Sequence, residues 1–373
     1  MPSGTLNSPI LFGNFSFTGG FQIELAEAEL IETQANKLTT SSAFNNATRP
    51  QGKHYDYEVH SKVYALFGGI EDFYIGNDLL IYGDLRAESI KYDYKNRMNS
   101  GNSREDGTNC GFGGCYYNRP DDRSDSYNEL SARAGITTDF DNINYFLQAS
   151  LGFRPPQINE AYRLQKKQNV TDLDSETLSM IEIGSRFESN AVNGTVSFYR
   201  SKKKNSIFRD AENFIVDNGK TDHEGIELSL DWLISSDNTI STNITYGDHK
   251  YDFETDTSMR EKIRAGNTID TSPKLMANLI WDLNLRGDTS LSFEIEYMSS
   301  YYTDAANLHE YEGHTLYHTR FNRDLTPSLK GFIRIDNILD KAYAERADFN
   351  AFGGDRYFPG LPRELYLGLE YTF

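Results

Sequence analysis

The sequence predicts an all-β protein, an antiparallel transmembrane β-barrel of about fourteen strands. Three observations favour this fold class. Apolar and polar residues alternate with period two along segments of about ten residues, whereas globular strands average about 5 to 6 residues. Long polar connections alternate with short ones along the chain. The chain is also rich in aromatic residues, with 24 Tyr and 23 Phe, although its mean hydropathy is only −0.61, as expected when every second strand residue faces water.

The composition argues against several other classes. No segment approaches the run of about 18 to 20 apolar residues that a membrane helix needs. The 37 basic and 55 acidic residues give a net charge of −18, so we expect no nucleic-acid partner, because nucleic-acid binders carry basic patches. The sequence contains no nucleophile elbow, phosphate loop or zinc-hydrolase motif, and we therefore predict neither an enzyme nor a bound cofactor. We interpret residues 1–373 as one barrel domain.

The predicted strands are defined by the side chains that alternate between their two faces. In the third, for example, Leu79, Ile81 and Leu85 occupy one face, and Asp84 and Arg86 occupy the other. The strands are expected near residues 12–31, 55–67, 78–94, 127–138, 143–153, 179–187, 193–202, 223–233, 239–250, 274–284, 291–301, 314–322, 329–339 and 363–373.

The connections between these strands fall into two alternating classes. The long, polar ones are expected at 32–54, 95–125, 154–178, 203–222, 251–273, 302–313 and 340–362. The short ones are expected at 68–77, 139–142, 188–192, 234–238, 285–288 and 325–328. Barrels of the bacterial cell outer membrane have short periplasmic turns and longer extracellular loops. We therefore expect this location, with outer-membrane lipid and lipopolysaccharide around the barrel and Phe373 in the periplasm.

The last eleven residues carry the clearest alternation. Leu365, Leu367, Leu369, Tyr371 and Phe373 lie on one face of an extended strand, and the opposite face carries carboxylates. This pattern is typical of a closing barrel strand whose apolar face contacts lipid, and we expect it to be the C-terminal signal for the barrel assembly machinery. The alternative is an ordinary sandwich strand that buries the same leucines inside a globular core.

The two cysteines, Cys110 and Cys115, are separated by a glycine-rich segment that can bend into a small ring. A lone pair without further cysteines or a nearby histidine is a poor zinc site. We therefore predict a disulfide formed in an oxidising compartment. The N-terminal residues show no basic region followed by an apolar one, so no signal peptide is visible, and we expect the chain to lack its natural beginning.

Six phrases in the second half of the chain resemble the C-terminal barrel of TonB-dependent outer-membrane receptors. They are Gly152-Phe-Arg-Pro-Pro-Gln-Ile-Asn-Glu-Ala-Tyr162, Glu176 followed by Glu182-Ile-Gly184, His223-Glu-Gly-Ile-Glu227, Tyr302-Thr-Asp304, Asp336-Asn-Ile-Leu-Asp-Lys-Ala-Tyr343 and Tyr357-Phe-Pro-Gly-Leu-Pro-Arg363. The phrases occur in the family's order over about 220 residues, whereas residues 1–150 match the family only in general character.

The resemblance implies a receptor that takes up a scarce large ligand, such as a ferric siderophore, haem, cobalamin or a glycan. Members of this family have a barrel of twenty-two strands plugged by an N-terminal domain, and a TonB-type protein supplies energy through that plug. Because the sequence shows no plug and about eight strands too few, we interpret it as the C-terminal part of such a barrel. The alternative is a passive porin-like or adhesin barrel that closes with its own strands.

Loop residues with aromatic or cationic side chains are the candidates for ligand contact. They are Tyr116, Tyr117, Arg119, Arg123, Tyr162, Arg163, Arg209, Tyr301, Tyr302, Phe352 and Arg356. For each of them the alternative is a solvated loop side chain or an interfacial aromatic residue, and the ligand itself stays unidentified.

Other polar groups suggest weaker hypotheses. His309, His314 and His318 invite a metal site, but the last two lie about 13 Å apart on one strand face, so we predict no chelation by this pair. Calcium binding by Asp121, Asp122 and Asp125 is less favoured than a solvated acidic loop. The lysines at 202–204 either contact anionic lipopolysaccharide or simply increase solubility, and the sequence leaves both interpretations open.

Overall fold

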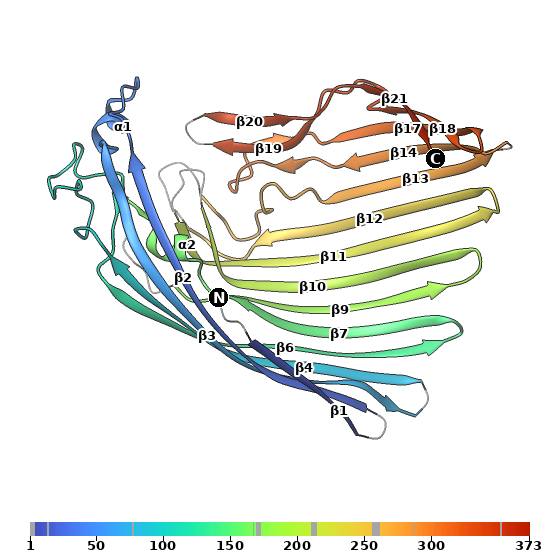
Figure 1. Cartoon of the computed structure of the whole chain (residues 1–373), viewed down its shortest axis with the longest axis horizontal. Coiled ribbons are helices and arrows are strands. Elements are labelled where there is room, and N and C mark those ends of the chain that lie inside the picture. Colours follow the sequence, from blue (N-terminus) through green and yellow to red (C-terminus); the bar gives the residue numbers. More distant parts are fainter. Residues whose placement is uncertain are drawn as a thin grey trace.

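A computed structural model describes residues 4–12, 15–76, 78–166, 168, 173–209, 215–255, 262–285, 287–350 and 353–373, without the side chains of 4–12, 209, 215 and 216. Fifteen strands form one antiparallel sheet in which sequence neighbours are also spatial neighbours (Figure 1). Among the described residues no ladder joins the first strand of this sheet to the last. The predicted all-β, antiparallel barrel class is confirmed.

The strands of the large sheet are long. They are β1 (Gly4–Phe12), β2 (Phe15–Gln34), β3 (Gly52–Ile75), β4 (Leu79–Asn96), β6 (Arg123–Phe140), β7 (Ile143–Arg154), β9 (Glu176–Glu188), β10 (Val192–Arg209), β11 (Ile215–Ser235), β12 (Asn238–Tyr251), β13 (Leu275–Leu285), β14 (Thr289–Met298), β17 (His314–Thr326), β18 (Leu329–Asp336) and β21 (Glu364–Tyr371).

The connections hold the remaining elements. Two short helices are α1 (Ala43–Thr48) and α2 (Ile158–Tyr162). Three small two-stranded sheets pair β5 (Tyr117–Asn118) with β8 (Leu164–Gln165), β15 (Tyr301–Tyr302) with β16 (Glu310–Tyr311), and β19 (Ala344–Asn350) with β20 (Gly354–Pro359). No helix in the described part of the chain is both long and apolar enough to span a membrane.

Apolar side chains cover one face of the large sheet, which we call the outer face; the opposite face is the inner face. Leu367 is 69% exposed and lies opposite Ile333 of β18, and the same apolar pairing recurs across the sheet, as between Ile136 and Leu147. Leu365, Leu369, Tyr371 and Phe373 are exposed as well. The leucines of the last strand therefore do not lie in the dry centre of a globular core.

Short turns and long connections lie at opposite ends of the strands (Figure 1). The turns occupy the right of the view, where the C-terminus also lies. One of them is Asp141–Asn142, whose residues have φ values of 49° and 64°, the left-handed pair that tight hairpins require. We call the opposite end, which carries both helices and the small sheets, the loop end.

The structure differs from the predicted boundaries in three places. The segment 68–77 is not a turn over its whole length, because β3 continues through it to Ile75 and pairs with β4. The segment 203–222 is not a long loop: β10 and β11 extend through it as a ladder that pairs Lys203 with Thr221 and Phe208 with Val216. Its polar sequence is misleading because strands that project beyond the lipid tolerate polar residues on both faces. The strand β1, which pairs with β2, precedes the first predicted strand.

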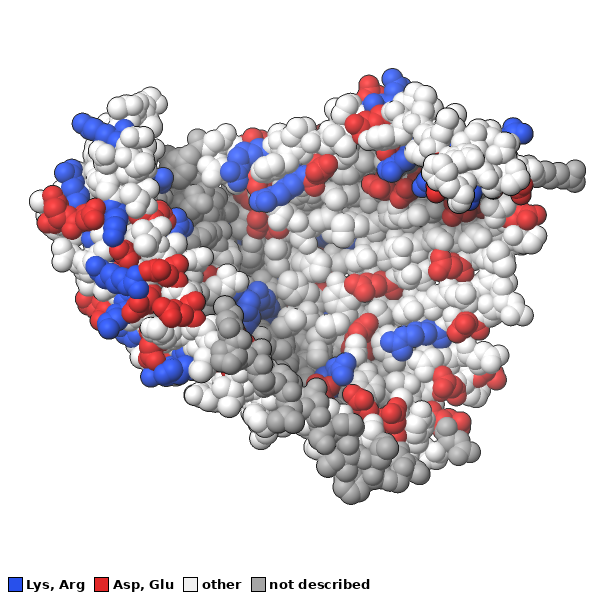
Figure 2. Space-filling view, in the orientation of Figure 1, with Lys and Arg blue, Asp and Glu red and all other residues white. Residues whose placement is uncertain are grey.

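The buried core lies at the loop end rather than in the middle of the sheet. Inner-face side chains of β3 and β4, including Tyr57, Val59 and Tyr94, are buried by loop residues such as Cys115 and Tyr162. Charged side chains gather at the left of Figure 2, the end where the loops lie, and are sparser over the strands to the right. The protein therefore consists of one large antiparallel sheet and, at its loop end, a group of packed connections that we call the cap.

Candidate functional site

Three connections meet at the loop end and are joined by backbone hydrogen bonds. The Tyr116 N–H donates to the carbonyl of Thr48 in α1 (2.8 Å), and the Lys166 N–H donates to the carbonyl of Tyr116 (2.7 Å). The small β5–β8 sheet pairs Tyr117 with Gln165. The connections 35–51, 97–122 and 155–175 therefore fold as one unit.

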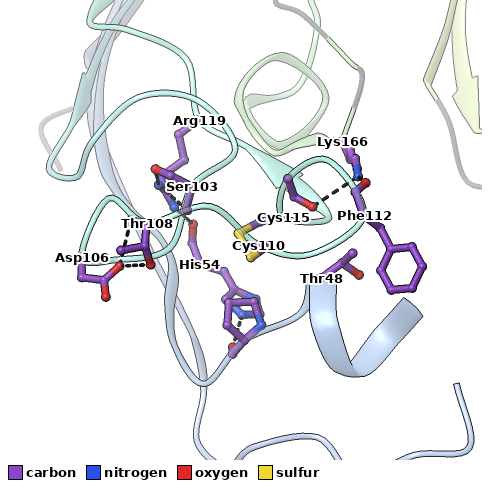
Figure 3. Close-up of a disulfide and its surroundings, with 12 residues drawn as sticks. Thr48, His54, Ser103, Asp106, Thr108, Cys110, Phe112, Cys115, Arg119 and Lys166 are labelled. Carbon is purple, nitrogen blue, oxygen red and sulfur yellow. Dashed lines mark hydrogen bonds between the residues drawn. A yellow bond between two sulfur atoms is a disulfide. The ribbon is translucent and has the colours of Figure 1, made fainter. Parts of the chain in front are cut away.

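A disulfide closes the tip of the connection 97–122. Cys110 and Cys115 are bonded and buried, and Phe112 between them points away from the ring (Figure 3). The Lys166 ammonium group donates to the carbonyls of Phe112 and Gly114. The backbone of Phe112 has a φ of 54°, a conformation that is uncommon for residues other than glycine. Its side chain is 63% exposed.

Phe112 belongs to a group of exposed and half-buried aromatic and cationic side chains that we call the aromatic tip. Its members are Phe44, Arg49, Phe112, Tyr116 and Lys166. The rings of Phe44 and Phe112 meet edge to face with centroids 5.6 Å apart, and the Arg49 guanidinium lies 4.3 Å from the Tyr116 ring centroid. Aromatic faces combined with cations can bind a ring-bearing or anionic molecule.

Arg119, in the same connection, is only 2% exposed. Its guanidinium donates to the carbonyls of Asn99 (2.6 Å), His54 (3.1 Å) and Ser103 (2.7 Å). Figure 3 shows it between these segments of the connection and β3. Because the buried guanidinium of Arg119 donates hydrogen bonds to three backbone carbonyls, it holds the backbone of the connection in one conformation.

A cluster of tyrosines attaches the connections to the sheet. Tyr55 of β3 donates to the carbonyl of Leu164, and Tyr162 of α2 donates to Asp125 of β6 (2.6 Å). Tyr162 is fully buried, and this burial, together with the hydrogen bond to Asp125, raises its pKa above the usual range. Burial also raises the pKa of Tyr117. Both phenols are therefore neutral at physiological pH.

An ion-pair network holds α2 against β9. Arg154 at the end of β7 donates to Glu176 (2.5 Å) and to both carboxylate oxygens of Glu160 (3.0 and 3.1 Å). Glu176 is buried and also accepts from the Ile207 N–H (2.7 Å) and from Lys203 (3.0 Å). Arg154 and Glu160 of the phrase 152–162 thus act together with Glu176 to attach α2 to the start of β9.

The phrase 336–343 folds as a fixed turn at the end of β18. The Asn337 side chain accepts from the Lys341 N–H (2.9 Å) and donates to the carbonyls of Lys341 (2.9 Å) and Leu361 (3.2 Å). Asp340 accepts from the Arg363 N–H (2.9 Å), so the turn is tied to the start of β21. Gly360 is required because a Cβ there would stand 2.1 Å from the Tyr343 ring.

The structure separates the predicted ligand-contact residues into two groups. Tyr117, Arg119, Tyr162 and Tyr301 are buried, whereas Tyr116, Arg163, Tyr302 and Arg356 are partly or largely exposed. Arg163 pairs with Glu32 (2.7 Å), Arg356 with Asp348 (2.6 Å), and Arg123 with Asp125 (2.8 Å). The Arg209 side chain and Phe352 lie outside the described residues. Only Tyr116 of the predicted set belongs to the aromatic tip.

The histidines and aspartates that suggested metal sites have separate partners. His309 pairs with Asp355 (3.2 Å), His314 contacts the Tyr311 hydroxyl (2.9 Å), and His318 pairs with Asp336 (3.2 Å). Asp122 accepts the Asn96 N–H (2.8 Å), and Asp121 is exposed. One group within the described chain, Glu27, Glu58 and His60 on the outer face, brings three ligand atoms within 4.8 Å of one another.

The lysines at 202–204 alternate between the faces of β10. Lys202 and Lys204 are exposed, and Lys202 pairs with Asp222 (3.1 Å), whereas Lys203 pairs with buried Glu176 on the inner face. These lysines therefore do not act as one cationic patch. Sequence reasoning missed the tip residues Phe44, Arg49 and Phe112, because no local pattern signals that two distant connections bring them together.

Comparisons with known proteins agree with this architecture. A family model described as "TonB dependent receptor-like, beta-barrel" matches residues 4–338. No curated protein matches the sequence. Among solved structures, the ferric-catecholate import receptor Fiu from E. coli has a TM-score of 0.73 at 17% identity, covering 99% of this chain and 54% of its own.

Two further solved structures have the same fold. The siderophore receptor PiuA from Acinetobacter baumannii has a TM-score of 0.72 at 16% identity and covers 98% of this chain and 55% of its own. The ferric citrate transporter FecA in the unliganded form has a TM-score of 0.73 at 19% identity, with 98% and 53% covered. This chain spans about half the length of these structures.

Proposed function

Since the chain belongs to the TonB-dependent receptor-like β-barrel family, we propose that it forms part of an outer-membrane receptor for energy-coupled uptake of a scarce large ligand. The family and the solved relatives are transport receptors rather than enzymes. The proposed location of the protein is the bacterial cell outer membrane, among lipid and lipopolysaccharide. Its proposed partners are the barrel assembly machinery and a TonB-type energising protein that acts through a plug.

The chain corresponds in this proposal to the C-terminal part of a twenty-two-stranded barrel. Support comes from the coverage of about half of each solved relative and from the sheet order, in which β1 and β21 are the two outermost strands. Residues 1–373 then form barrel wall and outer loops, and the plug is supplied by other residues of the receptor.

The aromatic tip is the observation that carries the ligand-binding part of the proposal. Phe112 is largely exposed, yet it is held in place by a disulfide and by Lys166. A side chain that is both exposed and preorganised loses little entropy when it binds a partner. The combination of rings with Arg49 and Lys166 favours a ring-bearing or anionic ligand, which includes ferric siderophores and haem.

Uptake by cells that produce the complete receptor tests this function. The probes are a ferric catecholate, ferric citrate, haem, cyanocobalamin and a maltodextrin, each supplied at nanomolar concentration with and without a protonophore. We expect uptake of one probe class that the protonophore abolishes. Ion conductance of the chain in planar bilayers without such uptake would instead favour the passive porin-like alternative.

Substitutions at the tip connect uptake to the site. Phe112→Ala removes an exposed ring and is expected to weaken binding of that probe by about tenfold, equivalent to about 1.4 kcal/mol. Leu308→Ala is the matched control, because Leu308 is also an exposed loop residue, at 78%, but lies on another connection. Equal binding by the two variants would exclude the tip as the contact surface and would leave the transport function standing.

A further inference from the structure

Two histidines of neighbouring strands face each other on the inner face of the sheet. His223 of β11 lies directly opposite His249 of β12, and their Nδ1 atoms are 2.9 Å apart. Both side chains are half-buried, which leaves them accessible to an ion. The pair is separate from the aromatic tip.

Thr221 determines how the first ring is oriented. Its hydroxyl lies 2.8 Å from Nε2 of His223, on the same face of β11. When Nε2–H donates to this hydroxyl, Nδ1 of His223 carries a lone pair directed at His249. Metal-bound histidines show the same arrangement, in which the second ring nitrogen donates to a fixed acceptor.

Two glycines make room for the second ring. Gly225 and Gly247 are cross-strand partners, and each lies two residues from a histidine on the same face of its strand. A Cβ at Gly247 would stand 2.5 Å from Nε2 of His249 and 3.2 Å from the Tyr199 hydroxyl, and one at Gly225 would stand 2.6 Å from that hydroxyl. The absence of both side chains therefore lets His249 and Tyr199 lie flat over the sheet.

Lys203 is a positive charge that disfavours a cation at His223, but this charge is paired with a carboxylate. Lys203 lies opposite Thr221, and its charge is compensated by Glu176 at 3.0 Å. The carboxylates at the positions adjacent to the histidines, Asp222 and Asp248, lie on the outer face, where they pair with lysines. A bound ion would therefore meet neutral imidazoles and no free ammonium group.

We propose that His223 and His249 bind one divalent transition-metal ion through their two Nδ1 atoms. Two nitrogens at about 2.0 to 2.1 Å from a metal and at right angles around it are about 2.9 Å apart. The observed separation therefore already fits one ion, and the two rings need only turn their lone pairs from each other toward it. Imidazole nitrogen suits Zn²⁺, Cu²⁺ and Ni²⁺. When the ion binds, His249 releases its Nδ1 proton to solvent and takes one up from solvent at Nε2, so that both ligands are neutral imidazoles and no net proton is released. Water completes the coordination of the ion.

Copper binding by the full chain in detergent micelles tests the site, because Cu²⁺ binds most tightly in this series and its EPR spectrum reports bound nitrogens. We expect one Cu²⁺ per chain, a spectrum with two imidazole nitrogens, and displacement by Zn²⁺. His223→Ala and His249→Ala should each leave at most one of the two nitrogens and weaken binding by about tenfold or more. Thr221→Val should weaken binding by about tenfold while the two-nitrogen spectrum is kept.

His60→Ala is the matched control, since His60 belongs to the exposed group with Glu27 and Glu58. The proposal is wrong if His60→Ala abolishes the signal, or if both His223→Ala and His249→Ala keep two nitrogens. Carbethoxylation of the unmodified chain gives a readout independent of variant folding. Metal should protect His223 and His249, and equal labelling with and without metal would overturn the proposal.

Discussion

The ring of Tyr162 in α2 stacks on the ring of Tyr94 in β4, with centroids 4.5 Å apart and an interplanar angle of 23°. Through this contact the connection 155–175 is attached to the inner face of the sheet. The hydroxyl of Tyr162 adds the hydrogen bond to Asp125, so one side chain joins a helix to two strands.

Truncation of Tyr162 should release the connections from the sheet. Tyr162→Ala is expected to destabilise the loop unit by about 3 to 5 kcal/mol, because it removes a fully buried aromatic ring. Tyr162→Phe keeps the ring and should cost about 1 to 2 kcal/mol through the lost hydrogen bond. Amide exchange of Tyr116 and Lys166 measures both effects, with Leu308→Ala, on another connection, as the exposed control. Equal exchange in all three variants would contradict the assignment.

The ion-pair network predicts that replacing Glu176 costs more stability than replacing Glu160. Glu176→Gln should lower the stability of the protein by about 2 kcal/mol, since it leaves Lys203 without its carboxylate partner and removes the charge bound by Arg154. Glu160→Gln should cost less, because Glu160 is more exposed and Arg154 keeps Glu176. Urea midpoints in detergent micelles compare the variants, and a larger loss for Glu160→Gln would be inconsistent with the network.

The disulfide predicts a local change at the aromatic tip. Replacement of Cys110 and Cys115 by serine should lower the stability of the connection 97–122 by about 2 kcal/mol, the entropy of closing so small a ring. Proteolysis of this segment should accelerate, while the urea midpoint of the sheet stays unchanged. Iodoacetamide should label both thiols only after reduction; labelling without a reductant would show that the bond is absent.

Asp270, in the connection 252–274, predicts a pH dependence. Burial raises the pKa of its carboxyl above the ordinary value of 3.8, with Asp304 and Asp348 adding to this effect and the hydrogen bond from Tyr251 opposing it. A raised folded-state pKa means that the folded connection binds the proton more tightly than the unfolded one. Its stability is therefore highest below pH 3.8 and falls as the pH rises through the raised pKa.

Replacing Asp270 shows whether its carboxyl, rather than another titratable group of the connection, causes the pH dependence. Asp270→Asn keeps an acceptor for Tyr251 but carries no charge, so the pH-dependent loss of protection should disappear. Amide exchange of Ile263, which donates to Thr255, at pH values on both sides of the raised pKa measures the effect. An unchanged pH profile in Asp270→Asn would assign the dependence to another group.

The two faces of β21 should differ in their tolerance of charge. Leu367→Arg places a cation on the outer face and is expected to cost about 2 to 4 kcal/mol in a bilayer. Tyr366→Arg, on the inner face one residue away, should cost less, because that face contacts water and polar groups. Urea titration of the chain folded into phosphatidylcholine vesicles compares them, and equal costs would refute the assignment of the faces.

The strands were predictable and the cap was not, for a physical reason. The alternation of apolar and polar residues along β4 or β21 involves only residues close together in the sequence, so the sequence alone predicts it. The same holds for the short turns. The burial of Arg119 and Tyr162 depends on partners that are distant in the sequence, such as His54, 65 residues from Arg119, and Asp125, 37 residues from Tyr162. No local pattern encodes these contacts. Hydropathy alone predicts a loop at 203–222, because it cannot distinguish a polar strand in water from a polar loop.

The length of β3 has a consequence for where the lipid ends. Its 24 residues, tilted by about 45°, rise about 55 Å, whereas the hydrocarbon layer is about 30 Å thick. On the outer face the pairing partners change from Ile23 and Tyr64 to Glu27 and His60 within four residues. In the outer-membrane location proposed above, the bilayer surface crosses β2 near Leu25, and the parts of β2 and β3 beyond this level hold the folded connections clear of the lipid headgroups.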